Sequence, residues 1–191
     1  MVLLDTLLAK YRIDGQRSAE LLDLLEGLFA DPSIRSGADY VCPLAGYYSH
    51  AGNHPAAAKI LRDSAAWAIG PDETAAIGYH LAYVLARSAD ATCVPEIDRL
   101  LGELPSDYPS VPALAHTTAL RHLTAGDHSA ALAAACRSLA SDALTAAEAA
   151  EVHLTLATVL TSLDRHEEAD AGRAQACRQA PHHQLLDLVH S

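Results

Sequence analysis

Apolar residues in several stretches of this chain recur every three or four positions, which is the spacing of one face of an α-helix. Alanine and leucine, which favour helices, supply much of the apolar share. β-Branched residues are sparse, and no stretch alternates convincingly between apolar and polar residues, so strands are not expected. The pattern therefore predicts an all-α protein.

Two amphipathic helices are predicted near the N-terminus, over residues 2–11 and 18–29. Asp14-Gly15 separates them, and Asp31-Pro32 ends the second. Their apolar stripes consist of Leu3, Leu4, Leu7, Leu8 and Tyr11 in the first helix and of Leu21, Leu22, Leu25, Leu28 and Phe29 in the second. We expect residues 1–31 to form a pair of capping helices that covers the open end of a helical array.

A pattern of small residues repeats four times in the rest of the chain. Its alanines, Ala45, Ala82, Ala119 and Ala157, follow one another at intervals of 37, 37 and 38 residues (82 − 45, 119 − 82 and 157 − 119). A larger side chain stands three residues after each alanine. Each segment is predicted to be the first helix of a helical hairpin, with the alanine where a neighbouring helix approaches closely.

A turn and a second helix follow in three of the four segments. The turns read Gly52-Asn53-His54, Gly126-Asp127-His128 and Asp164-Arg165-His166, and another alanine stands three residues after each histidine. Glycine suits a tight turn, and Asn or Asp can cap the next helix. The second helices are expected to end near Ile69, Ser141 and Ala180. In the remaining segment, a longer turn without glycine follows Arg87.

Local signals refine the expected helix starts. Thr145 with Glu148 and Asp164 with Glu167 have the spacing of a capping box. Pro43 lies close to the first repeat alanine and fits a helix well only in its first turn.

The four segments resemble tetratricopeptide repeats (TPRs). That family has Leu then Gly or Ala in the first helix, a polar turn, small residues early and late in the second helix, and then proline. The fourth segment matches best, through Leu156, Ala157, Ala169, Ala176 and Pro181. The resemblance implies a right-handed α-solenoid of antiparallel hairpins with about ten helices. The chain would be a single domain (1–191), with four hairpins over 38–181 and a tail or short helix over 182–191.

Charge and hydropathy exclude several classes of partner. The formal charge is −11, from 24 acidic and 13 basic side chains, which disfavours direct binding to nucleic acid or to anionic membranes. No apolar run approaches about 18 residues, and the N-terminus lacks the basic region of a signal peptide. Four widely spaced cysteines suit a reducing compartment. We expect a cytoplasmic protein, and the high Arg-to-Lys ratio and abundant alanine favour a bacterial source.

No catalytic motif is present. The chain lacks nucleophile-elbow, P-loop, dinucleotide-binding and HExxH patterns. Eleven histidines invite a metal hypothesis, but metal binding needs three or four converging ligands. His50 and His54 have ligand spacing, yet Gly52-Asn53 is expected to break the helix between them. We therefore expect no enzymatic activity, no metal and no cofactor.

The resemblance implies that the first helices of the hairpins line a concave groove. The groove candidates are Asp39 in the first hairpin, Tyr79, Tyr83 and Arg87 in the second, His116 in the third and Glu151 in the fourth. The three residues of the second hairpin are spaced i, i+4 and i+8, so they form one stripe. They fit recognition of a partner, with an aromatic surface and a guanidinium for a carboxylate. Alternatively, the tyrosines pack between hairpins and the arginine is merely solvated.

Three functions remain open at this point. The leading hypothesis is an adaptor or regulatory module that binds a peptide or helix of a protein partner in the groove. The second is self-assembly, for example as a homodimer that pairs through the leucine-rich N-terminal helices. The third is a small-molecule binder or enzyme, with a pocket lined by histidine and tyrosine, among them His80 and His116.

Overall fold

The computed structural model describes residues 27, 37–106, 108 and 111–180 of the 191-residue chain. In that part every regular element is helical, which confirms the all-α fold: there are eight α-helices, α3 to α10, and one short 3-10 helix, η1. About ten helices were expected. The two predicted over residues 2–11 and 18–29 and the predicted tail (182–191) lie outside the described residues, apart from Gly27, which is helical.

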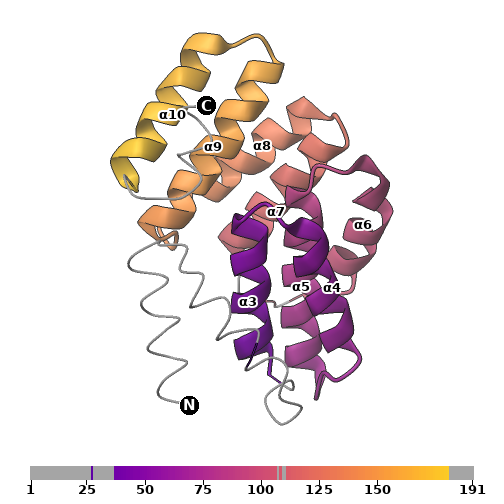
Figure 1. Cartoon of the computed structure of the whole chain (residues 1–191). Helices are drawn as coiled ribbons and strands as arrows, with labels where there is room; N and C mark the ends of the chain where they lie inside the picture. Colours follow the sequence, from indigo (N-terminus) through magenta and orange to yellow (C-terminus); the bar gives the residue numbers. More distant parts are fainter. Residues whose placement is uncertain (1–26, 28–36, 107, 109–110, 181–191) are drawn as a thin grey trace. The chain divides into compact units, whose positions relative to one another are not determined.

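The helices follow one another in pairs along the chain (Figure 1). The first pair is α3 (Ala38–His50) and α4 (His54–Ala65), and the second is α5 (Pro71–Arg87) and α6 (Val94–Gly102), with η1 (Ala91–Cys93) between them. The third is α7 (Val111–Thr124) and α8 (His128–Leu139), and the fourth is α9 (Ala146–Ser162) and α10 (His166–Gln179). No helix in these residues is both long and apolar enough to cross a membrane.

The helices divide into two compact units. Unit 1 covers residues up to 88 and residues 98–105, and unit 2 covers residues 89–97 and those from 106 onward. In unit 1, α3, α4 and α5 all contact one another. In unit 2, α9 contacts α7, α8 and α10, and α7 contacts α8. The helices α3, α7 and α9 therefore each pack against their own second helix and against a neighbouring first helix, and α5 packs against α3 and α4.

The repeated alanines occupy the positions of closest packing. Ala45, Ala82 and Ala119 are fully buried, and Ala157 is 1% exposed. The contact between α9 and α10 shows why the position must be small. A Cβ atom added to Gly172 of α10 would lie 3.5 Å from the Cβ of Ala157 and 3.4 Å from the backbone oxygen of His153. That Cβ atom would just reach van der Waals contact, so a side chain larger than alanine at either position would push the two helices apart.

Two of the predicted turns form as expected. Gly52 and Gly126 have φ angles of +79° and +76°, which are favourable only for glycine. Asn53 accepts a hydrogen bond from the backbone N–H of Ala56 (3.3 Å), and Asp127 does the same from Ala130 (3.0 Å). The break at Gly52-Asn53 separates His50 from His54, as predicted.

The fourth hairpin departs from this scheme. The capping box predicted for Asp164 and Glu167 is wrong, because Arg165 is the N-cap residue and makes no side-chain cap. Asp164 instead takes the place of the turn glycine, with φ of +59°. The capping box of Thr145 and Glu148 is confirmed: Glu148 N–H donates to Thr145 Oγ1 (3.2 Å), and Thr145 N–H donates to Glu148 Oε2 (2.8 Å).

One expectation about the first hairpin is wrong, and Pro43 does not lie where a proline fits a helix best. The second helix ends at Ala65 rather than near Ile69, because the Ile69 N–H donates to a carboxylate oxygen of Glu73 instead of a helical carbonyl. Pro43 lies inside α3 and beyond its first turn. A proline there cannot donate to the carbonyl of Asp39, four residues earlier. Asp39 is exposed, so water can satisfy that carbonyl.

Candidate binding surface

Arg87, in the last turn of α5, links the ends of two first helices in unit 1. Its Nη1 donates to His50 Nδ1 at the end of α3 (3.1 Å) and to the hydroxyl oxygen of Tyr83 (3.3 Å). The guanidinium carbon also lies 5.6 Å from the centroid of the Tyr83 ring, within the range of a cation–π contact. Because arginine only donates, His50 Nδ1 must be the acceptor, and the proton of neutral His50 is then on Nε2.

Two further polar residues adjoin this link. The Ser49 hydroxyl, which is 1% exposed as a residue, lies 3.2 Å from His54 Nδ1. Burial, and secondarily the charge of Arg87, lowers the pKa of His54. His54 is therefore neutral at pH 7, beside a permanently charged guanidinium. We call Ser49, His50, His54, Tyr83 and Arg87 the polar cluster of unit 1.

The other candidates in unit 1 lie at different depths. Tyr79 is only 8% exposed and packs edge-on against His80, with the ring centroids 5.3 Å apart. Tyr83 and Arg87 are partly exposed, so the stripe on α5 runs from the core towards the surface. Asp39 is exposed at the start of α3, eleven residues (50 − 39) before His50. That separation is about 16 Å along a helix, so the structure does not bring Asp39 to the polar cluster.

Cys42 and His80 are poorly suited to chemistry. Burial, with smaller contributions from Asp39 and Glu73, raises the pKa of the Cys42 thiol to about 12. The thiolate needed for a nucleophile or a metal ligand is therefore absent at neutral pH. Burial also lowers the pKa of His80 to about 4, which makes this imidazole a weak base at pH 7.

His116 makes the corresponding link between first helices in unit 2. It is 7% exposed on α7, and its Nε2 lies 2.9 Å from Oγ1 of Thr155 on α9, which is 8% exposed. The Thr155 hydroxyl donates its one proton to the carbonyl of Glu151 (3.2 Å), so His116 Nε2–H is the donor to Thr155. Glu151 itself is partly exposed, one turn before Thr155.

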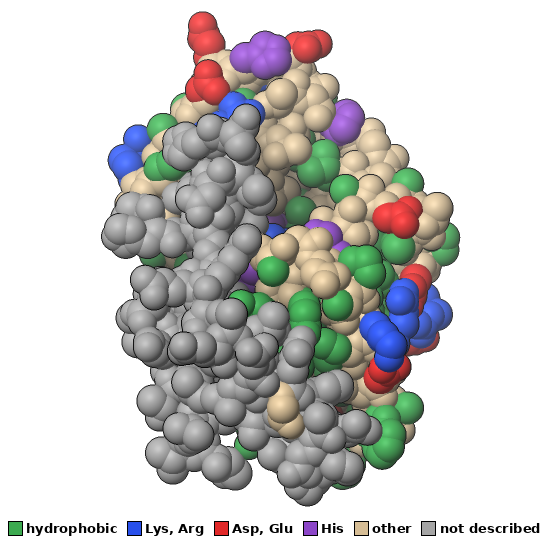
Figure 2. All heavy atoms as spheres, in the orientation of Figure 1, with side chains coloured by type: hydrophobic (Ala, Val, Ile, Leu, Met, Phe, Trp, Pro, Cys, Tyr) green, Lys and Arg blue, Asp and Glu red, His purple; other side chains and the backbone are tan. Residues whose placement is uncertain are grey.

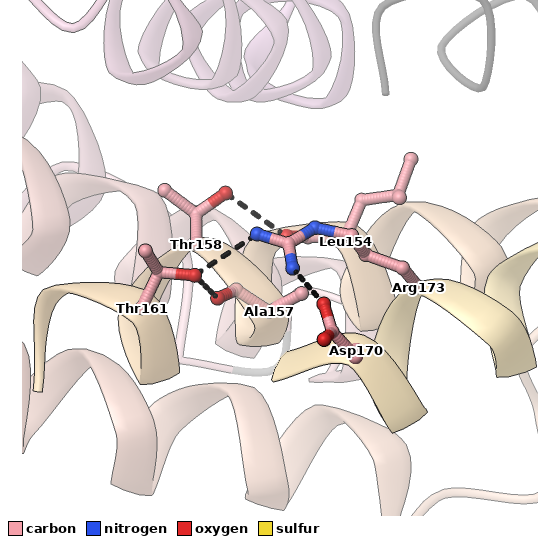
Figure 3. A network of polar contacts seen from close by, with 6 residues as sticks. All are labelled: Leu154, Ala157, Thr158, Thr161, Asp170 and Arg173. Carbon is pink, nitrogen blue, oxygen red and sulfur yellow. Dashed lines mark hydrogen bonds and ion pairs between the residues drawn. The ribbon is translucent and has the colours of Figure 1, made fainter. Parts of the chain in front are cut away.

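Hydroxyl groups on α9 extend this polar face towards α10. Thr158 donates to the carbonyl of Leu154 (3.0 Å), and Thr161 donates to that of Ala157 (2.9 Å). Figure 3 shows Arg173 of α10 reaching across to this row. Its Nη2 donates to Thr161 Oγ1 (2.9 Å), and its Nη1 donates to Asp170 (2.7 Å). Of these contacts, the hydrogen bond between Arg173 and Thr161 joins α9 to α10, and the others lie within one helix.

The three turn histidines differ in their surroundings. His54 has Ser49 as a partner for Nδ1, whereas the Nδ1 of His128 is buried without one. His166 is exposed. It is the first residue of α10. Figure 2 shows histidine and acidic side chains close together at the top of the view. The sequence predicted one structural role for all three histidines. Their hydrogen bonding differs, because it depends on which side chains the neighbouring helix presents to each ring.

Metal chemistry receives no support from the part of the chain that the structure describes. Within those residues, no group of three or more His, Cys, Asp or Glu side chains is placed to hold an ion. The four cysteines are all free thiols. The polar cluster of unit 1 contains hydrogen-bonding side chains and the charge of Arg87. Such groups can recognise a ligand without a metal.

Paired helices, buried repeat alanines and contacts between successive first helices define a TPR-like α-solenoid fold. Comparisons with solved structures show the same fold. The structure of MamA (MSR-1 C2) is 16% identical to this chain, covers 93% of it and 94% of its own length, and gives a TM-score of 0.51. A structure from Podosopora anserina, described as a putative kinesin light chain with nearly identical TPR-like repeats, is 20% identical. It covers 94% of this chain and 93% of its own length, with a TM-score of 0.53.

The sequence comparisons add no closer relative. No protein-family model matches the chain, and no curated protein matches it. At 16% and 20% identity, the two structures establish the fold of this chain and leave its partner to be argued from its own side chains.

Proposed function

We propose that this chain is a non-enzymatic protein-interaction module, an adaptor or regulatory protein of the cytoplasm. It binds a peptide or helix of a protein partner on the face formed by its first helices. Tyr83 and Arg87 make the main contacts, and Tyr79 supports them from below. In unit 2, His116 and Glu151 belong to the corresponding face. No cofactor or metal takes part in this role.

The observation that carries the proposal is the position in which Arg87 is held. Its hydrogen bonds to His50 and Tyr83 restrict a long side chain before any partner arrives. Holding a side chain in its bound conformation reduces the entropy lost on binding. Tyrosine and arginine are also the residue types that most often dominate the binding energy of interfaces. A guanidinium can bind a carboxylate of the partner through two parallel hydrogen bonds.

An enzymatic role is less well supported by the same surroundings. A general base works best when its pKa lies near the operating pH, and the pKa of His80 is about 4. His116 donates its Nε2 proton to Thr155 and holds α7 against α9. Asp39 lies at the far end of α3 from the polar cluster. Asp39 is therefore not placed to act as an acid–base pair with the histidines of the polar cluster.

The test compares three forms of the chain: the wild type, Arg87→Gln and Arg99→Gln. Arg99→Gln is the matched control, because it removes one positive charge from an exposed ion pair with Glu103 (2.7 Å) on α6. Each form is immobilised and exposed to lysate of the native host, and the retained proteins are identified by mass spectrometry. The affinity of a retained protein is then measured in purified form.

We expect a protein that the wild type and Arg99→Gln retain equally, and that Arg87→Gln binds at least about tenfold more weakly, a loss of roughly 1.4 kcal/mol. Melting curves of the three forms check that the fold is intact. Equal retention by all three forms would remove Arg87 from the binding surface. A molecular mass that rises with protein concentration, with no specific partner retained, would instead favour self-assembly.

A further inference from the structure

Trp67 and Ile69 form an apolar tip between α4 and α5. Their side chains are 54% and 77% exposed, and among the residues that the structure describes they are the large hydrophobic side chains with high exposure. They stand two positions apart in the loop of residues 66–70, within unit 1. Two large apolar side chains that are this exposed within one short loop are candidates for a contact surface.

Hydrogen bonds hold the loop in this conformation. The Trp67 N–H donates to the carbonyl of Ser64 (2.9 Å), and the Ile69 N–H donates to Glu73 Oε2 (2.5 Å). The Thr74 hydroxyl donates to the carbonyl of Gly70 (2.8 Å), whose φ of +94° turns the chain into α5. The tip is therefore held outward by defined contacts, so covering it requires little further ordering of the loop.

Glu73 also places the start of α3 beside this tip. Its second oxygen, Oε1, accepts a hydrogen bond from the Ala38 N–H (2.8 Å). One carboxylate thus binds the first residue of α3 and the backbone of Ile69 together. The backbone nitrogens of Ala38 and Ile69 both lie within hydrogen-bond distance of this one carboxylate, so they must be close to each other. The chain therefore enters α3 next to the apolar tip.

The segment that precedes α3 carries a matching apolar stripe. The predicted helix over residues 18–29 presents Leu21, Leu22, Leu25, Leu28 and Phe29 on one face. Gly27 is helical, and a Cβ added to it would meet nothing within 4 Å, as expected on the face opposite the stripe. Phe29 is eight residues (37 − 29) before Gly37, and an extended chain of that length spans up to about 28 Å. The stripe can therefore reach the tip.

We propose that this stripe covers Trp67 and Ile69, so that the helix over residues 18–29 docks on the loop between α4 and α5 of the same chain. A second copy of the chain is a poorer occupant. Two exposed side chains provide far less than the roughly 1,200 Å² of total buried surface that a stable interface between two proteins needs. A helix of the same chain needs less buried area, because its covalent link to α3 keeps it close to the loop and removes most of the entropy cost of association.

Trp67 is the only tryptophan of the chain, so its fluorescence reports directly on whether the tip is covered. The experiment measures the emission maximum and the quenching by acrylamide in the full-length protein. The test variant is Leu25→Ser with Phe29→Ser, in the apolar stripe. The matched control is Glu20→Ser with Asp23→Ser, on the polar face of the same predicted helix.

We expect blue-shifted emission and weak quenching in the wild type and in the control. The stripe variant should show emission close to that of tryptophan in water and a several-fold rise in quenching, with helicity by circular dichroism retained. A wild-type Trp67 that is quenched as readily as free tryptophan would overturn the proposal without reference to any variant. So would shielding that disappears on dilution, which would assign the cover to a second copy. Shielding that persists in the stripe variant would point to a different segment and equally contradict the proposal.

Discussion

His54 and His128 occupy the same position of their hairpins, nine residues after the repeat alanine (54 − 45 and 128 − 119) and first in the second helix. The Nδ1 of His54 has a partner in the hydroxyl of Ser49, four residues after its alanine. The third hairpin has Leu123 at that place, so the buried Nδ1 of His128 has no partner. One substitution between repeats thus changes a satisfied imidazole into an unsatisfied one.

This difference predicts opposite effects for the same mutation. His128→Phe should raise the free energy of unfolding by on the order of 1 kcal/mol, because it removes a buried nitrogen that lacks a hydrogen bond. His54→Phe should lower the free energy of unfolding by about 1–3 kcal/mol, because it leaves the buried Ser49 hydroxyl without its histidine partner. Urea unfolding of both variants checks this, with each serving as the control for the other. A shift of the same sign in both would show that the two sites are equivalent.

The sequence predicted these histidines as structural turn residues, but not their different energetics. The partner of His54 lies five residues earlier, on another helix, and its contact depends on how the turn folds back. The same limitation applies to Tyr79 and Arg87. Their i, i+8 spacing placed both on one face of α5, yet that face runs from the core to the surface. Only the packing of α3 against α5 shows which end of the stripe is accessible.

At the scale of helices and turns, periodic small residues gave the most reliable signal. The four repeat alanines identified the first helices correctly, because close packing of two helices excludes larger side chains at that point. Helix ends were predicted less well. The early end of α4 depends on Glu73, whose carboxylate accepts a hydrogen bond from the Ile69 N–H four residues earlier. The same carboxylate binds the Ala38 N–H, 35 residues away, and a tertiary contact of this kind leaves no local pattern in the sequence.

The long turn after α5 yields a prediction about backbone strain. Ala89 has a φ of +55°, in the left-handed region where a Cβ atom costs about 1–2 kcal/mol. Ala89→Gly should therefore raise the free energy of unfolding by about 1 kcal/mol. The control is Ala51→Gly, at an exposed position with an ordinary φ of −76°, where added flexibility of the unfolded chain should lower stability. Thermal melting compares the two variants, and a loss of stability in Ala89→Gly would contradict this account of the turn.

On the scale of the whole molecule, three partly buried histidines are expected to determine the response to acid. Burial lowers the pKa of His80 to about 4, and burial also lowers the pKa values of His54 and His153, with smaller effects from Arg87 and Arg178 respectively. In the unfolded chain, histidine titrates near pH 6.5. As the pH falls below that value, the unfolded chain takes up protons that the folded chain does not. The free energy of unfolding must therefore fall between about pH 6.5 and pH 4.

The predicted loss is large enough to measure. Moving from about pH 7 to pH 5 should cost about 2 kcal/mol through His80 alone, with further losses through His54 and His153. His80→Gln removes that titration, so its stability should depend less steeply on pH over the same interval, whatever its stability at pH 7. His166→Gln, at a side chain that is 68% exposed, is the control and should keep the wild-type slope. If His80→Gln also keeps that slope, His80 is hydrated in solution and the acid response arises elsewhere in the fold.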